Sequence, residues 1–485
     1  MLRCWFALVL TPALLAQSGV PQKLIARAES STAMIDDLRE LCDTIGGRAT
    51  GSPACERATG WGAAKFRAAG VTNVHLEPYT IPRTWLPGTI SVEATAPAPF
   101  TIRAAAAPTS PSTAAPIEAP LVDVGDGSAE AFAKAAGRLK GAIVLVHSSE
   151  MRTLDDLFAE YMRSPGISAA AKKYGAAAVL LESSRPRGLL YRHPILLGTG
   201  LAPVPNAVIS REHAGRLARL AERGPVRVRF AMSNRIGGPY RAANVVAEIP
   251  GTDKANEIVV LGAHLDSWEL GTGAEDNGVN AAAVVDAARA FVQLGVHPRR
   301  TVRLVLFTGE EQGMLGSAAY VKQHAASMGS HVMMLTFDTG SGHTSGFFLN
   351  GREELRKPLD AILQAAGVTG ASEHVADAID GTDNFDFLLS GVPNLVANQD
   401  AVPYLPDYHA ESDTFERVNV KEAQRNNALA EVLVWGFADA PDRPAPPQSR
   451  EEVEKLIGDT KLEEQMRVFN QWDDFAAGRR GAPKH

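Results

Sequence analysis

The sequence predicts an α/β fold, and residues 257–311 carry most of that prediction. An apolar, β-branched run in this segment ends in His264 and Asp266, and a Gly-rich loop and an Ala-rich helical stretch follow it. A second apolar run then ends in Glu310 and Glu311. Strands joined through a helix lie parallel, so their carboxyl ends open on one crevice, where open α/β sheets bind ligands.

Length and composition indicate a globular protein with more than one unit. The chain has 485 residues, of which 45% are hydrophobic and 21% are charged, so we expect two or three units. The formal net charge of −7 is spread along the chain, without basic runs. We therefore expect no nucleic-acid partner.

The first 16 residues have the layout of a secretory signal peptide, with one early positive charge and an apolar stretch that ends in Ala16. We expect the protein to be secreted or periplasmic. We expect no transmembrane segment, because no later stretch approaches the roughly 20 apolar residues that a bilayer helix needs. An oxidising compartment favours a disulfide between Cys42 and Cys55, and two buried free thiols are the alternative.

The other elements are expected on the basis of periodicity and composition. Helices are predicted over residues 22–45 and 56–69, and a strand over 73–79. The Pro- and Ala-rich stretch 96–120 indicates a boundary, and short apolar strands after it indicate a small α/β insertion. The expected units are 1–16 (signal peptide), 22–115 (first part of the main domain), 116–236 (insertion), 237–440 (rest of the main domain) and 441–485 (Pro-rich linker and amphipathic helix).

A third apolar run, 332–337, again ends in a carboxylate, Asp338, and the loop 402–414 adds His409. Each such residue can have a local purpose; Asp276 before Asn-Gly, for example, is also typical of a turn or a helix cap. Three successive strands with carboxylates at the same end nevertheless favour a shared site. Crowded carboxylates raise one another's pKa unless cations compensate, and imidazole mixed with carboxylates suits zinc.

Four motifs resemble those of secreted co-catalytic zinc exopeptidases, in particular the carboxypeptidase Q-like enzymes. They are His264-Leu265-Asp266-Ser267, Gly273-Ala274-Glu275-Asp276-Asn277-Gly278, Thr308-Gly309-Glu310-Glu311, and Tyr408-His409 with Asp413-Thr414. The resemblance covers most of the chain beyond the signal peptide. It implies a three-layer αβα sandwich with an eight-stranded, mixed, mainly parallel sheet. Residues 119–233 resemble the protease-associated domain that such enzymes carry as an insertion.

This resemblance implies two zinc ions as cofactors. His264 and Asp338 would hold one ion, Glu311 and His409 the other, and the Asp276 carboxylate would bridge both.

Four further residues receive roles from the same resemblance. Glu310 would be the general base that takes a proton from the attacking water and passes it to the leaving amine. Asp266 would stand behind His264 and fix its imidazole, and Asp413 would do the same for His409. Tyr408 would donate a hydrogen bond to the oxyanion.

The implied substrates are short peptides, best dipeptides with both termini free. A zinc aminopeptidase, which would use the same residues, stays open. So do a glutaminyl cyclase-like acyltransferase of the same fold and a non-catalytic receptor-like ectodomain, although the intact site residues argue against the last. Residues 381–384 depart from the Ser-Asp-His sequence of many relatives, which leaves the side-chain preference open. A monomer and a homodimer are both open.

Overall fold

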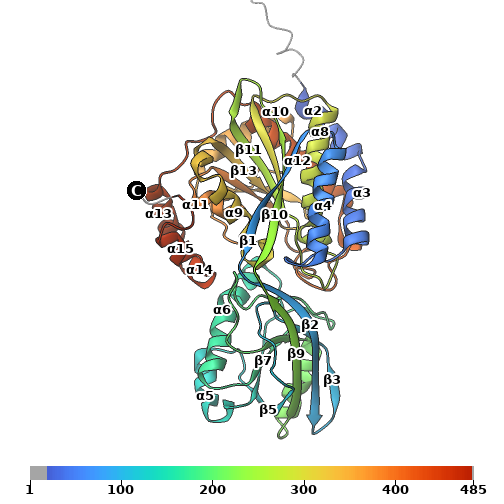
Figure 1. Cartoon of the computed structure of the whole chain (residues 1–485), viewed down its shortest axis with the longest axis vertical. Coiled ribbons are helices and arrows are strands. Elements are labelled where there is room, and N and C mark those ends of the chain that lie inside the picture. Colours follow the sequence, from blue (N-terminus) through green and yellow to red (C-terminus); the bar gives the residue numbers. More distant parts are fainter. Residues whose placement is uncertain (1–18, 483–485) are drawn as a thin grey trace, which may run out of the picture.

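The computed structural model of this chain describes residues 19–482, so the expected signal peptide, residues 1–16, lies outside the described residues. The described chain forms two units, each built on one β-sheet, which follow each other along the long axis of the molecule (Figure 1). Within residues 19–482, no helix combines the length and the apolar content that a membrane crossing requires.

The first unit is built on a mixed sheet of seven strands. Strands β12, β11, β13 and β15 run parallel to one another, and β1, β10 and β14 run antiparallel to their neighbours. The sheet is therefore smaller and less parallel than the eight-stranded one that the resemblance implies. In spatial order the strands are β1 (Asn73–Ile81), β10 (Tyr240–Ile249), β12 (Arg300–Phe307), β11 (Lys254–His264), β13 (His331–Thr336), β15 (Asn394–Gln399) and β14 (Thr344–Phe348).

Helices cover both faces of this sheet, in three αβα layers. Alternate residues of a strand point to opposite faces, so Val259 and Leu261 pack with one set of helices while Val260 packs with the other. The first face carries α2 (Val20–Ser30), α4 (Pro53–Ala68), α8 (Val279–Gln293), α10 (Arg356–Ala366) and α12 (Val420–Asp439), with α3 (Ala33–Glu40) against α8. The second face carries α9 (Leu315–Gln323) and α11 (Phe385–Leu389).

The second unit has an eight-stranded sheet in which β5, β6, β7 and β8 are parallel. The spatial order is β3 (Phe100–Ile102), β2 (Thr84–Ala96), β9 (Arg227–Gly237), β5 (Ile117–Asp123), β6 (Ile143–Val146), β7 (Ala178–Glu182), β8 (Asn206–Ile209) and β4 (Ala104–Ala106). Its helices are α5 (Ala129–Leu139), α6 (Leu154–Lys173) and α7 (Arg211–Ala221).

The second sheet begins earlier in the sequence than residue 116. Strand β2 pairs with β9 from Thr84 opposite Gly237 to Ala96 opposite Arg227. Residues 84–106 therefore belong to the second sheet, although the composition of the sequence predicts the first unit for them. The Pro- and Ala-rich stretch lies within the second unit, where it joins short strands, and does not mark its border.

Two further expectations are corrected by the structure. The C-terminal segment forms three short helices, α13 (Arg450–Thr460), α14 (Leu462–Val468) and α15 (Trp472–Ala476), because Lys461 and Asn470 adopt positive φ between them. Cys42 and Cys55 are buried free thiols and form no disulfide, and burial raises the pKa of both.

A buried charge network ties α2 to α8 and α12. Arg27 Nη1 lies 2.7 Å from Asp286 Oδ2 and 3.3 Å from Glu431 Oε1, and both carboxylates are fully buried. We predict that Arg27→Met lowers the free energy of unfolding by about 3–5 kcal/mol, because it leaves buried negative charge without this partner. Urea unfolding measures the loss, and Lys455→Met, which breaks an exposed ion pair with Asp459, is the control. Equal losses in both variants would contradict the prediction.

Candidate active site

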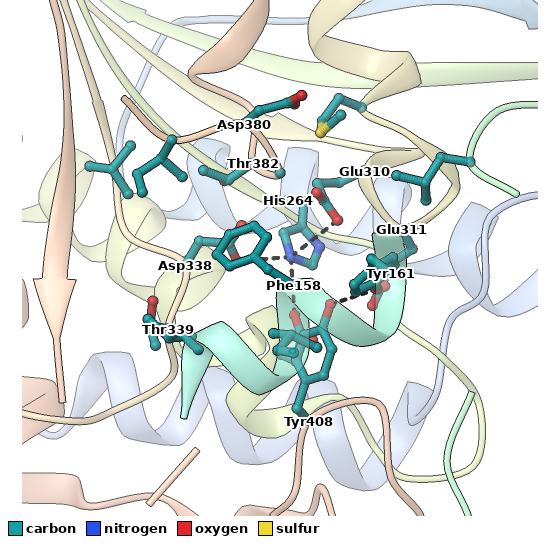
Figure 2. Close-up of a pocket in the computed structure, with 18 of the residues that line it drawn as sticks. Phe158, Tyr161, His264, Glu310, Glu311, Asp338, Thr339, Asp380, Thr382 and Tyr408 are labelled. Atoms are coloured by element: carbon teal, nitrogen blue, oxygen red, sulfur yellow. Dashed lines mark hydrogen bonds and ion pairs between the residues drawn. The ribbon is translucent and has the colours of Figure 1, made fainter. Parts of the chain in front are cut away.

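The expected site residues meet at the carboxyl edge of the parallel strands of the first sheet. Neighbouring parallel strands end at the same edge, and the loops that follow them form the walls of one pocket there. The contributors are His264 (end of β11), Asp276 (loop before α8), Glu310 and Glu311 (turn after β12), Asp338 (after β13), and Tyr408 and His409 (loop after β15). Figure 2 shows His264 at the centre of this pocket, with Glu310 and Asp338 directed toward it.

The first candidate metal site consists of His264, Asp276 and Asp338. His264 Nε2 lies 3.0 Å from Asp338 Oδ1 and 3.2 Å from Asp276 Oδ1. The imidazole is 1% exposed, so bulk water does not screen these contacts.

The second candidate metal site consists of His409, Glu311 and the same Asp276. His409 Nε2 lies 2.7 Å from Glu311 Oε2 and 3.3 Å from Asp276 Oδ2. Asp276 thus turns one carboxylate oxygen to each site, which is the geometry of a bridging ligand.

In their neutral form, both imidazoles present an unprotonated nitrogen to these carboxylates. His264 Nδ1 lies 2.9 Å from the carbonyl oxygen of Asp266, and His409 Nδ1 lies 3.0 Å from that of Arg192. A carbonyl only accepts, so each Nδ1 carries the proton and each Nε2 of a neutral ring offers a lone pair. That lone pair faces carboxylate oxygens, and a cation between them converts mutual repulsion into shared coordination.

The buried carboxylates of the site also lack the hydrogen-bond donors that buried polar atoms usually have. Asp276 Oδ2 and both oxygens of Glu311 are buried and accept no hydrogen bond from the described residues. Burial, together with neighbouring carboxylates, raises the pKa of Glu310 and Glu311 well above its ordinary value. The donor set and its unbalanced charge therefore fit two zinc ions.

The two histidines differ in how their surroundings act on protonation. Burial lowers the pKa of His409 to about 4, so its ring is neutral and suited to a metal. At His264 burial also lowers the pKa, but Asp338 and Asp276 outweigh it and raise the pKa well above its ordinary value. A proton on His264 balances the negative charge of these carboxylates, which a bound cation would otherwise balance.

Glu310 lies beside both groups and belongs to neither. Its Oε2 is 3.9 Å from His264 Nε2, and its side chain lines the pocket. Its backbone N–H donates to Asp266 Oδ1 over 3.3 Å. The carboxylate is therefore held next to the candidate metal ligands, with its oxygens directed into the pocket (Figure 2).

Two supporting residues act differently from the sequence-based expectation. The carbonyl of Asp266, not its carboxylate, accepts from His264; the carboxylate accepts from the Thr50 hydroxyl and from the Glu310 N–H. Asp413 does not contact the His409 imidazole. It accepts the N–H of Glu275 over 2.7 Å and that of Asp276 over 3.2 Å, so it fixes the loop that carries the bridging ligand.

Tyr408 lines the pocket, with its ring stacked on His409 at 3.7 Å between centroids, and its role as oxyanion donor stays a prediction. In the segment that departs from Ser-Asp-His, the Asn384 amide donates to Asn394 Oδ1 over 2.9 Å, away from the pocket. Thr382 from that segment lines the pocket together with Asp338.

Sequence reasoning missed three residues that support the site. Arg48 is fully buried and donates to the carbonyls of Leu265, Thr272 and Gly273, so it holds the strand end and the Gly-rich loop together. The motif IGGRATGS, which contains Arg48, was the available signal. Tyr404 lines the pocket with its ring 5.3 Å from that of Tyr408, and Tyr161 reaches the pocket from α6 of the second unit.

Comparisons with known proteins agree with this geometry. The sequence profile of peptidase family M28 matches residues 244–434, which hold all five candidate ligands. Carboxypeptidase Q of Bos taurus is 30% identical over 406 residues, covering 82% of this chain and 84% of that protein. Carboxypeptidase Q of Homo sapiens is 28% identical over 406 residues, covering 82% and 84%.

Two solved structures extend the likeness to the fold. A peptidase M28 precursor from Shewanella amazonensis SB2B superposes with a TM-score of 0.81 at 28% identity, covering 89% of this chain and 98% of that one. A zinc aminopeptidase from Bacillus subtilis superposes with a TM-score of 0.68 at 19% identity, covering 86% and 98%, and shows likeness of fold alone.

Proposed function

The chain belongs to peptidase family M28 and is a metallo-exopeptidase, and from this premise we propose that it hydrolyses dipeptides with free termini at a site that holds two zinc ions. The observation that carries the proposal is the pair of three-residue groups that share Asp276. His264 and Asp338 would hold one ion, Glu311 and His409 the other, and Asp276 both. Zinc bound there supplies a Lewis acid that polarises the scissile carbonyl and lowers the pKa of water.

The residues around the ligands account for the proton movements. Glu310 Oε2 takes the proton of the attacking water and returns it to the leaving amine, which suits a carboxylate that lines the pocket outside both ligand groups. The Tyr408 hydroxyl donates to the oxyanion, which forms at the carbonyl oxygen when water attacks the carbonyl carbon. Asp266 holds the Glu310 backbone, and its carbonyl fixes the His264 ring.

The charges of the pocket support recognition of an ammonium group. The described residues that line it include five carboxylates and two histidines but no lysine or arginine. Asp276, Glu311 and Asp338 would hold zinc and Glu310 would move the proton, so Asp380 is the carboxylate left for a free α-amino group. A carboxylate terminus, by contrast, would not find a basic side chain. This observation also favours the second candidate function, an aminopeptidase. The likeness to carboxypeptidase Q supports recognition of the carboxyl end of the substrate as well.

The rest of the pocket wall is apolar. It combines side chains from α6 and the β7–β8 loop of the second unit, from the first unit and from the C-terminal segment: Leu154, Leu157, Phe158, Leu197, Met314, Phe348, Ile379, Val396 and Phe469. We propose that the preferred substrates carry a bulky apolar side chain, since burying one contributes about 1.5–3 kcal/mol.

We also propose that the second unit is a protease-associated insertion and that the enzyme acts after export, in the periplasm or outside the cell. The signal-like layout of residues 1–16 supports export. The position of the second unit between β1 and β10 supports an insertion into the peptidase domain.

We predict that free Leu-Leu is hydrolysed faster than its N-acetyl or amide derivative, and about tenfold faster than free Asp-Asp. Chelation should abolish turnover and added zinc restore it. Initial rates of amine release measure all four peptides, and a long peptide blocked at both ends is the control. Equal turnover of long peptides with a free amino terminus would favour the aminopeptidase, and cleavage inside the blocked peptide would refute the exopeptidase assignment.

A further inference from the structure

Helix α6 of the second unit forms one wall of the active-site pocket. Phe158 and Tyr161 project from it toward the metal ligands, and the Tyr161 hydroxyl lies 2.8 Å from the Tyr408 hydroxyl (Figure 2). The Tyr161 ring is held between the His193 ring, at 4.8 Å between centroids, and the Phe469 ring, at 5.9 Å. Side chains from the second unit and the C-terminal segment thus fix the place of this hydroxyl.

The segment that carries Tyr408 is also fastened to the second unit. Arg185 Nη2 donates to the Tyr408 carbonyl over 3.1 Å. The Arg192 N–H donates to the His409 carbonyl, and His409 Nδ1 donates to the Arg192 carbonyl, each over 3.0 Å. Tyr191 and Ala410 form an isolated β-bridge. The backbone at Tyr408 and directly after it is therefore fixed to the second unit, which sets the separation of the two hydroxyls.

A pair of phenol hydroxyls at this distance shares one hydrogen bond, with one hydroxyl as donor and the other as acceptor. If Tyr161 donates, the Tyr408 oxygen is occupied as an acceptor and its own proton is free to point into the pocket. Donation to an oxyanion then increases negative charge on the Tyr408 oxygen, and the hydrogen bond from Tyr161 strengthens with it. In the opposite arrangement the Tyr408 proton would be withdrawn from the substrate.

We propose that Tyr161 is a positioning residue of the peptidase reaction, which directs the Tyr408 proton toward the reacting carbonyl. The inference rests on the proposed function of Tyr408 as oxyanion donor. It makes the second unit part of the active centre, because the hydroxyl that completes the donor pair comes from an element more than 200 residues away along the chain.

A double-mutant cycle tests this proposal. Tyr408→Phe should lower kcat by about 10²–10³-fold, as removal of an oxyanion donor does. Tyr161→Phe should lower kcat by about 3–10-fold, because it removes one supporting hydrogen bond, while KM, bound zinc and Tm stay near those of the unaltered enzyme. The variant that carries both changes should be no slower than Tyr408→Phe alone, since Tyr161 acts only through Tyr408.

Tyr174→Phe is the matched control, because Tyr174 ends the same helix, stacks on Phe132 and does not line the pocket. It should leave kcat unchanged. Unchanged kcat in Tyr161→Phe, or the same fold-loss from Tyr161→Phe with and without Tyr408, would overturn the inference. A loss confined to Tm would also overturn it by assigning Tyr161 a purely structural role. Normal turnover of Tyr408→Phe would instead refute the proposed role of Tyr408 itself and pass it to Tyr404.

Discussion

Glu310→Gln should keep two zinc ions per chain and lose about 10²–10⁴-fold in kcat. Glu310 lies outside both ligand groups, with its Oε2 3.9 Å from His264 Nε2, so the substitution removes no ligand. Glutamine keeps the shape of the side chain, and its amide cannot accept the proton of the attacking water. Turnover should therefore fall while the metal content stays unchanged. Substitution of a metal ligand would instead lower both.

Metal analysis after dialysis and steady-state kinetics on a free dipeptide measure the two properties. Glu310→Asp is the informative companion, because it keeps a carboxylate with shorter reach and should retain more turnover than the amide. Glu373→Gln, at an exposed position on the first unit, is the neutral control. Near-normal kcat in Glu310→Gln would show that another group takes the proton.

The part of the fold that the sequence predicts is the part encoded by local patterns. The β-branched run before His264 and the Ala-rich stretch after Gly278 have clear periodicities, and they form β11 and α8. The order of strands is not local. Strand β2 joins the second sheet because its residues pair with β9, more than 130 residues later, and no composition shift at residue 84 announces this. The free Cys42 and Cys55 depend in the same way on the packing of separate helices.

The same distinction separates the ligands from the residues that orient them. His264, Glu311 and Asp338 each follow a predicted strand, so the topology of a parallel sheet is enough to bring them together. The acceptor at His409 Nδ1 is a backbone carbonyl, that of Arg192, and any residue type can supply one. Motifs list side chains, so the sequence indicated a carboxylate, that of Asp413, as the partner of His409. In the structure the backbone carbonyl of Arg192 accepts from His409 Nδ1.

Asp276→Ala should reduce zinc at both sites together, whereas His409→Ala should chiefly reduce it at one. The reason is the shared carboxylate: Asp276 Oδ1 lies 3.2 Å from His264 Nε2, and Oδ2 lies 3.3 Å from His409 Nε2. Loss of a residue that merely supports a ligand costs 10–100-fold in metal affinity, so loss of the ligand itself should cost more than about 100-fold at each site it serves.

Zinc per chain, measured at a fixed free-zinc concentration that saturates the unaltered enzyme, gives the readout. Asp276→Ala should approach zero zinc and His409→Ala about one, with hydrolysis lost in both. Asp276→Asn is the matched control, because it keeps the side-chain shape and one carbonyl oxygen, and it should retain more zinc than the alanine variant. If Asp276→Ala kept one tightly bound zinc, as His409→Ala should, Asp276 would not be a bridging ligand. Removing a carboxylate that holds both ions must weaken both sites.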